Sequence, residues 1–460
     1  MLRLLLVITL ATTAAWAQPD TMVPPEPDPT PTPRTPNPIT PPEREAVWLF
    51  EEAQRLHRQG APARAIELYR RALVQDPGRL EYRPYLGLAL DQTGSPREAL
   101  DQYNQYLKLE PEDQRVQLLR AAAWLHADDL VQARTALDRL TLSGSGNAYV
   151  HNLKGLLLLR VGQPAAAVTE FQAALAAMPG MAAARLNLSA AYLQSGQLDA
   201  ARAELATILA KAPADAQALN NLAVAQARGQ DLAAARTTLE QVPSLGAGTR
   251  ERYAPELAHD LTQASLNLAT VLAREGLDKE ALLVLAQLLD NQPQLLEAHL
   301  LNARLLTRQK RYEEARKDID VVLAAGPGSP LWSFANEVSG LIFLAQGQDE
   351  AARVDLDKAV KADPQRASAH HNYSMALGRT GQLVAAIDEE KKAMALAGDV
   401  PAMWYHLGVL YDLDARPNDA IEAYKKYLGL GGLDPEAAAA LKEHVAELQD
   451  RISGRPGKPP

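Results

Sequence analysis

The 460-residue chain has no cysteine, and only 5% of its residues are aromatic. Without cysteine, the protein cannot use a thiolate nucleophile, a disulfide framework or a thiolate-bound metal. Its charge also argues against nucleic acid as a partner. The 47 Lys and Arg against 56 Asp and Glu leave a net charge of −9, whereas binding to phosphates requires basic residues. The low aromatic content predicts a core of small aliphatic side chains packed at close range.

The sequence also lacks the motifs that place catalytic groups or cofactors. It contains no H-E-x-x-H metal pair, no G-x-x-x-x-G-K-[ST] phosphate loop and no G-x-S-x-G nucleophile turn. The adjacent His370 and His371 would point about 100° apart on a helix, so these two cannot share a metal ion. We therefore predict a non-enzymatic protein with no catalytic residue, no cofactor and no metal site.

Residues 1–17 have the pattern of a secretory signal peptide. A positively charged start is followed by an apolar stretch at residues 4–14 and a small-x-small cleavage site at residues 15–17. The apolar stretch is shorter than the roughly 20 residues that span a membrane. We expect a mature protein that is exported to the bacterial periplasm or secreted, with no stable membrane span after cleavage. The alternative is an uncleaved signal that anchors the N-terminus in the membrane.

The 31 prolines fall into two groups, and the first is a spacer. Residues 19–42 contain 11 prolines in 24 residues and almost no apolar side chains. Proline favours extended polyproline II geometry, and such a segment cannot bury enough apolar surface to fold. Residues 18–45 are therefore predicted to form a disordered, semi-rigid spacer, or less favourably a ligand for a proline-recognising partner. Residues 453–460 are predicted to be a disordered tail.

The second group of prolines follows a repeat of 34 residues. A glycine, an alanine five residues later and a proline seventeen residues after the glycine recur along the chain, and apolar residues between them have helical spacing. This pattern predicts two helices per unit, with the glycine ending the first helix and the proline ending the second. The glycines that define the period are Gly60 and Gly94, Gly162 and Gly196, and Gly347 and Gly381.

One unit matches a known family pattern closely. Its residues Trp404, Leu407, Gly408, Tyr411, Ala420 and Tyr424 fit W-x2-L-G-x2-Y…A-x3-F. The chain resembles the tetratricopeptide repeat family over Ala46 to Leu433. We count eleven units, which start at Ala46, Leu80, Gln114, Ala148, Ala182, Ala216, Thr262, Leu296, Ser333, Ala367 and Pro401.

The resemblance implies an all-α protein, a right-handed α-solenoid of stacked helix-turn-helix repeats. Six repeats would occupy residues 46–261 and five would occupy residues 262–434, followed by a capping helix at residues 435–452. An insert near residues 246–259 would interrupt the stack after the sixth repeat. It is interpreted as a tolerated surface insertion, or alternatively as a loop or hinge that contacts a partner.

The family implies a concave groove lined by the first helix of each repeat, which binds an extended peptide or a partner protein. The sixth residue of the repeat recurs as Asn187, Asn221, Asn267 and Asn372, which resembles the asparagine ladder of the O-GlcNAc transferase family. An amide can hold a peptide backbone whatever its sequence. The alternative interpretation is that these asparagines bond a neighbouring repeat or a helix end.

Arginine recurs near the end of the first helix, and Arg228, Arg274 and Arg379 are the candidates for the groove wall. They would attract carboxylates, or else they would oppose the dipole at a helix C-terminus. We therefore predict a protein-interaction scaffold or adaptor in the bacterial cell envelope. The alternative is a regulatory or carrier subunit of an envelope complex for polysaccharide export, cell-wall synthesis or secretion.

Overall fold

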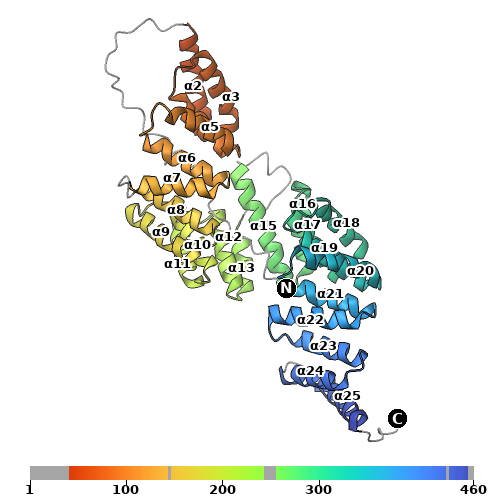
Figure 1. Cartoon of the computed structure of the whole chain (residues 1–460). Coiled ribbons are helices and arrows are strands. Elements are labelled where there is room, and N and C mark those ends of the chain that lie inside the picture. Colours follow the sequence, from red (N-terminus) through yellow and green to blue (C-terminus); the bar gives the residue numbers. More distant parts are fainter. Residues whose placement is uncertain (1–40, 143–146, 243–254, 431–434, 454–460) are drawn as a thin grey trace. The chain divides into compact units, whose positions relative to one another are not determined.

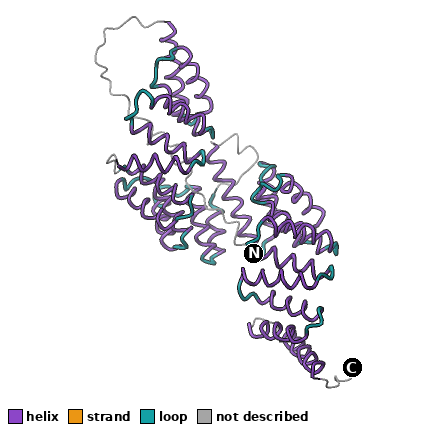
Figure 2. The backbone as a smooth tube through the Cα atoms, viewed as in Figure 1, coloured by secondary structure: helices purple, strands orange, loops and turns teal. Residues whose placement is uncertain are grey.

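The computed structural model describes residues 41–142, 147–242, 255–430 and 435–453. Within these ranges the protein forms 23 helices and no strand (Figure 2). The predicted signal peptide, most of the spacer and the tail after residue 453 lie outside the described residues. None of the described helices is long and apolar enough to cross a membrane.

The chain forms two compact units, which meet in the sequence between Leu277 and Asp278. The first unit contains the helices up to Glu275: α2 (Pro41–Arg58), α3 (Pro62–Gln75), α4 (Tyr82–Gln92), α5 (Pro96–Leu107), α6 (Gln114–His126), α7 (Leu130–Leu142), α8 (Ala148–Arg160), α9 (Pro164–Ala177), α10 (Ala182–Gln194), α11 (Leu198–Leu209), α12 (Ala216–Arg228), α13 (Leu232–Leu239) and α15 (Pro255–Glu275).

The second unit contains the remaining helices. They are α16 (Asp278–Asn291), α17 (Leu296–Arg308), α18 (Tyr312–Ala324), α19 (Trp332–Ala345), α20 (Asp349–Ala362), α21 (Ala367–Arg379), α22 (Leu383–Ala397), α23 (Pro401–Leu413), α24 (Pro417–Leu430) and α25 (Pro435–Ser453). Within each unit the helices pack in pairs that follow one another in chain order (Figure 1). The predicted all-α class and the stacking of helix pairs are confirmed.

The helix boundaries follow the predicted repeats with two differences. Helix α2 begins at Pro41, so the first repeat starts earlier than Ala46 and includes the end of the predicted spacer. Helix α15 begins at Pro255, so the second part of the predicted insert belongs to this helix, and the rest lies outside the described residues. The boundary between the units falls inside the seventh predicted repeat, because α15 packs on α12 and α13 while α16 packs on α17.

The turn between the two helices of a repeat has the same backbone geometry whatever residue occupies it. Gly60 has a φ of +75°, in the left-handed region that glycine adopts at low cost. The third repeat has Asp128 at this position and the sixth has Gln230, with φ values of +59° and +69°. The packing of the two helices therefore imposes the left-handed conformation even where the sequence does not offer glycine.

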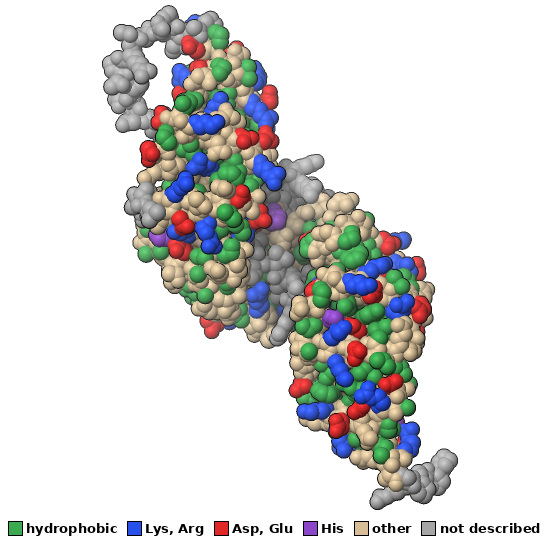
Figure 3. Space-filling view, viewed as in Figure 1, with side chains coloured by type: hydrophobic (Ala, Val, Ile, Leu, Met, Phe, Trp, Pro, Cys, Tyr) green, Lys and Arg blue, Asp and Glu red, His purple; other side chains and the backbone are tan. Residues whose placement is uncertain are grey.

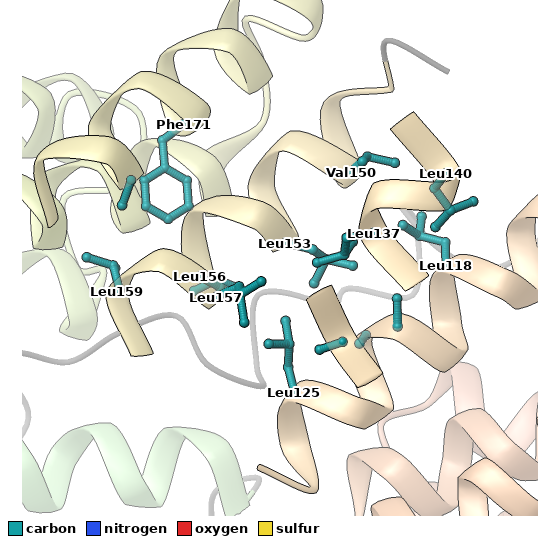
Figure 4. Close-up of a cluster of buried hydrophobic side chains, with 14 of the residues drawn as sticks. Leu118, Leu125, Leu137, Leu140, Val150, Leu153, Leu156, Leu157, Leu159 and Phe171 are labelled. Carbon is teal, nitrogen blue, oxygen red and sulfur yellow. The ribbon is translucent and has the colours of Figure 1, made fainter. Parts of the chain in front are cut away.

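In the repeats whose two helices lie in one unit, the core lies between these helices. Phe171 of α9 contacts α8 at Gly155, where a Cβ would lie 2.5 Å from Phe171 Cε1. The same contact joins Gly87 to Tyr103, again at 2.5 Å from the ring. Figure 4 shows the cluster in which Phe171 and the leucines of α6, α7 and α8 meet. Small residues in the first helix are thus needed for the close approach of the second.

The twenty-fourth residue of each repeat, here termed the core position, is buried in all eleven repeats. Ten repeats have an aliphatic or aromatic residue there: Tyr69, Tyr103, Leu137, Phe171, Leu205, Leu239, Leu285, Ile319, Leu356 and Tyr424. The tenth repeat has Glu390, whose exposed fraction is 0%. The tenth repeat therefore has an acidic residue at the position where the other ten repeats have an aliphatic or aromatic core residue.

Candidate functional site between neighbouring repeats

The predicted asparagines lie in the interfaces between repeats. Asn187 and Asn267 have exposed fractions of 0% and Asn372 of 3%. Asn187 Nδ2 donates to Asn152 Oδ1 at 3.1 Å, and Asn267 Nδ2 donates to Asn220 Oδ1 at 2.8 Å. In each case the sixth residue of one repeat bonds the fifth residue of the repeat before it. We call this pair of positions the amide latch.

The latch in the second unit uses a carboxylate as the acceptor. Asn372 Nδ2 donates to Glu337 Oε1 at 2.9 Å, and Arg366 Nη1 lies 3.6 Å from Glu337 Oε2. The guanidinium of Arg366 also lies over the ring of Phe334, 3.1 Å from its centroid. The buried carboxylate is therefore paired with a cation, as a charge inside a protein must be.

Asn221 occupies the same helical position as the other three asparagines and is equally buried. It lies next to Asn220, which accepts the hydrogen bond from Asn267. These contacts correspond to the second interpretation that the sequence left open, in which the amides bond a neighbouring repeat. Asn187 Oδ1 and Asn152 Nδ2 are buried and have no hydrogen-bond partner among the described residues, so the single bond between the two amides leaves one acceptor and one donor unsatisfied. Peptide binding by the four asparagines stays a prediction.

The arginines at the end of the first helix make a second contact between repeats. Arg228 Nη1 donates to the main-chain oxygen of Leu193, and Arg379 Nη1 donates to that of Leu344, both at 2.8 Å. Each acceptor lies in the last turn of the preceding repeat's first helix or next to its end. The cation thus meets the carbonyl end of a neighbouring helix, where the helix dipole favours positive charge. Arg274 is half-buried in the last turn of α15.

Arg379, and also Arg160 and Arg308 at the ends of other first helices, face an aspartate, which reduces their free positive charge. Arg379 Nη1 lies 3.3 Å from Asp349 Oδ1, and Arg160 lies 3.6 Å from Asp128. Arg308 pairs with Asp278. On the face of the second unit shown in Figure 3, acidic and basic side chains are interspersed. The positive charge that was predicted to attract carboxylates is therefore partly neutralised within the protein.

Comparison with protein families identifies the repeat. The model described as tetratricopeptide repeat matches residues 56–122, 89–157 and 158–220, and a second model with the same description matches residues 266–330. The chain belongs to the tetratricopeptide repeat family. No curated protein matches the chain.

Solved structures align with the chain over different lengths. The APC/C hetero-tetramer Cut9-Hcn1 aligns with a TM-score of 0.52 at 15% identity, over 87% of this chain and 76% of that one. PilW, a type IV pilus biogenesis factor, aligns with a TM-score of 0.42 at 21% identity, over 49% of this chain and 98% of its own. YrrB, described as having an unusual peptide-binding site, aligns with a TM-score of 0.32 at 19% identity, over 39% and 91% of the two chains.

A pocket of about 530 Å³ lies beside the last tetratricopeptide repeat, between α22, α23 and α24. Trp404, Leu407 and Tyr411 form its apolar side, and Lys391, Asp419 and Glu422 supply charge. Trp404 Nε1 donates to Asp399 Oδ1 at 3.0 Å, which fixes the indole ring. This combination of aromatic faces and carboxylates suits an apolar or cationic side chain of a partner.

The sequence search missed one cluster of side chains. His371, Glu390 and His406 converge from α21, α22 and α23, although they are 19 and 16 residues apart along the chain. The adjacent His370 and His371 face different carboxylates, since His370 pairs with Glu389 and His371 pairs with Glu390. The signal that could have revealed the cluster is Glu390 itself, the acidic residue at a core position.

Proposed function

We propose that the chain is a non-enzymatic scaffold or adaptor of the bacterial cell envelope, which binds an extended peptide or a segment of a partner protein on the first helices of its repeats. The observation that carries this proposal is the family membership together with the position of polar residues between neighbouring repeats. The chain places buried amides and arginines between repeats, where they hold one repeat on the next. A rigid stack of this kind presents a continuous surface to a partner.

Exposed apolar side chains on the first helix of the last repeat give that surface its contact area. Tyr405 of α23 is 46% exposed and Leu413 is 62% exposed. Tyr405 lies beside Tyr427 of α24, with ring centroids 5.3 Å apart. Aromatic side chains that are exposed and held in place are typical anchors of protein interfaces. The pocket beside Trp404 adds a site for one side chain of the partner.

The envelope location rests on the sequence of residues 1–17. An exported chain would begin at Gln18 after cleavage, and mass spectrometry of the protein from a bacterial periplasmic extract measures that terminus. A chain that retains residues 1–17 in the membrane fraction would support the anchored form. A full-length chain in the cytoplasm would contradict the proposed location.

Site-specific photocrosslinking tests the binding surface. A photoreactive amino acid placed at position 405 or 413 lies on a first helix, whereas position 384 lies on a second helix. Val384 is the matched control because it is apolar and 68% exposed. We expect a crosslinked partner from positions 405 and 413 and none from position 384. Equal crosslinking at all three positions, or at none of them, would contradict binding on the first helices.

The identity of the crosslinked partner separates the scaffold from the carrier subunit. If the chain is a carrier subunit, mass spectrometry of the crosslinked species from intact cells would identify a polysaccharide-export, cell-wall or secretion enzyme. A set of non-enzymatic envelope proteins would favour the scaffold. Substrate turnover by the purified chain alone would contradict a non-enzymatic function.

A further inference from the structure

Glu390 is an unusual residue for the place that it occupies. It lies at the core position of the tenth repeat and has an exposed fraction of 0%. A buried carboxylate is costly unless polar partners surround it. Ten other repeats avoid this cost with an apolar or tyrosine side chain at the same position. The partners of Glu390 therefore indicate why an acid stands here.

Two histidines from different repeats meet this carboxylate. His371 Nδ1 lies 2.8 Å from Glu390 Oε1 and 3.0 Å from Oε2, and His406 Nδ1 lies 3.1 Å from Oε2. The two imidazole rings are 5.4 Å apart between centroids and nearly perpendicular, at 87°. His371 is the fifth residue of the tenth repeat and His406 the sixth residue of the eleventh. They occupy the two positions that form the amide latch elsewhere.

The cluster combines a buried acid with accessible bases. The side chains of His371 and His406 are 15% and 19% exposed, so solutes can reach the imidazoles while Glu390 stays covered. Burial acts to raise the pKa of Glu390, but the hydrogen bonds from the two histidines outweigh it, and the pKa is lowered from its usual value of 4.5. The carboxylate is therefore ionised at neutral pH.

We infer that His371, Glu390 and His406 form a binding site for a divalent transition metal, with Zn²⁺ as the matching ion. One ligand atom from each side chain lies within 4.8 Å of the other two. In tetrahedral zinc sites with bonds of about 2.0–2.1 Å, ligand atoms are about 3.3 Å apart, which small rotations of the imidazoles supply. Two imidazoles with one carboxylate form a zinc set that leaves the fourth position open. Magnesium and calcium prefer oxygen ligands.

Binding at this site joins two repeats. The metal would connect α21 and α22 of the tenth repeat to α23 of the eleventh, in the place where other junctions have an amide hydrogen bond. Both Nδ1 atoms now face Glu390, so each must be free of a proton to bind the metal, which a neutral imidazole achieves by carrying its proton on Nε2. The fourth position would take water or a carboxylate or imidazole from a partner. Among the described residues, no other set of three such side chains converges in this way.

The site is tested with the full chain, purified without a histidine tag and freed of metal by a chelator. Zinc is titrated in a calorimeter, and bound zinc is counted by elemental analysis after gel filtration. We expect one zinc ion per chain at this site and a rise of several degrees in the melting temperature, because a ligand that binds only the folded state stabilises it. Magnesium and calcium at the same concentration should give no rise.

Two substitutions remove ligands and introduce residues that other repeats carry. Glu390→Leu introduces the residue found at Leu205, and His406→Asn introduces the amide found at Asn372. Both variants should fold, as circular dichroism would show, and both should bind zinc at least about 100-fold more weakly. His299→Gln is the control, since His299 also pairs with a carboxylate, Asp318, at 2.7 Å. It should leave the zinc affinity unchanged.

The results of the zinc experiments do not depend on whether the proposed scaffold function is correct. A wild-type chain that shows no zinc binding would overturn the metal site and leave the interaction surface unaffected. Zinc binding that survives both Glu390→Leu and His406→Asn would likewise overturn the metal site and leave the interaction surface unaffected. Loss of binding in these two variants, with affinity retained in His299→Gln, would support the site.

Discussion

Two junctions between repeats use the same pair of positions with different chemistry. At the junction of the fourth and fifth repeats, Asn187 bonds Asn152, and the core position beside it holds Phe171. At the junction of the tenth and eleventh repeats, the two positions hold His371 and His406, and the core position holds Glu390. The separation along the chain is 35 residues in the first case and the same in the second.

The difference shows which requirements the fold imposes and which it leaves free. An amide pair and an aromatic core are sufficient to hold one repeat on the next, because the amides bond each other across the junction and the ring fills the space between helices. A carboxylate with two imidazoles is not needed for that purpose. The tenth repeat therefore contains a feature that stacking does not explain, and the following predictions test this distinction.

The largest expected effect is at the core position itself. Phe171→Ala should lower the free energy of unfolding by about 3–5 kcal/mol, because it leaves a cavity against Gly155. Glu390→Leu, measured without metal, should cost less than Phe171→Ala, because leucine fills the space and the two imidazoles that lose their acceptor are partly exposed and can bond water. Chemical denaturation followed by circular dichroism measures both. A large loss of stability in Glu390→Leu would show that the acid is required for the stack.

A smaller effect is expected at the amide latch. Asn187→Ala should cost about 1–3 kcal/mol, because Asn152 then remains buried without its hydrogen bond. The double variant Asn152→Ala with Asn187→Ala should cost less than the sum of the two single changes. A double-mutant cycle measures this coupling. Additive losses would mean that the two amides do not act as a pair.

The turns of the two regions also differ. The fourth repeat has Gly162, with a φ of +75°, whereas the eleventh has Ala415 with a φ of +54°. An alanine in the left-handed region is strained, so Ala415→Gly should stabilise the protein by up to about 1 kcal/mol. The thermal midpoint measures this gain. Gly162→Ala is the reciprocal change and should destabilise the protein. Destabilisation by Ala415→Gly together with stabilisation by Gly162→Ala would contradict the account of the turn.

A third junction sharpens the comparison by using a single histidine. His57 Nε2 lies 2.6 Å from Gln92 Oε1, between the first and second repeats. Burial lowers the pKa of His57 below 6.5, against a smaller opposite effect of the bond to Gln92. The unfolded chain therefore binds this proton more readily, and stability should fall as the pH drops from 6.5 through the folded pKa. Unfolding between about pH 7.5 and pH 5.5 should be less pH-dependent in His57→Asn, and an unchanged slope would exclude this group.

The sequence alone was sufficient for the features that depend on local structure. The spacing of glycine and proline predicted the helix pairs, because each turn and each helix end is determined by nearby residues. It did not predict that Asp128 and Gln230 would adopt the left-handed turn, which the packing of two helices enforces.

Contacts between repeats were harder to anticipate, because their partners are 35 residues apart. Asn187 and Asn267 were singled out as groove residues, and only the structure shows that their amides face Asn152 and Asn220. Glu390 belongs to none of the patterns that the sequence offers. Alignment of all eleven repeats at the core position would have revealed it, since an acid there cannot reach water.

The most direct test of the account converts the second junction into the first. The triple variant His371→Asn, Glu390→Leu and His406→Asn restores an amide latch and an apolar core position, and its melting temperature is measured with and without zinc. We predict that the variant folds, melts at or above the temperature of the metal-free wild-type chain, and shows no change with zinc, whereas the wild-type chain is stabilised. A variant that unfolds, or one that zinc stabilises as much as the wild-type chain, would contradict the account.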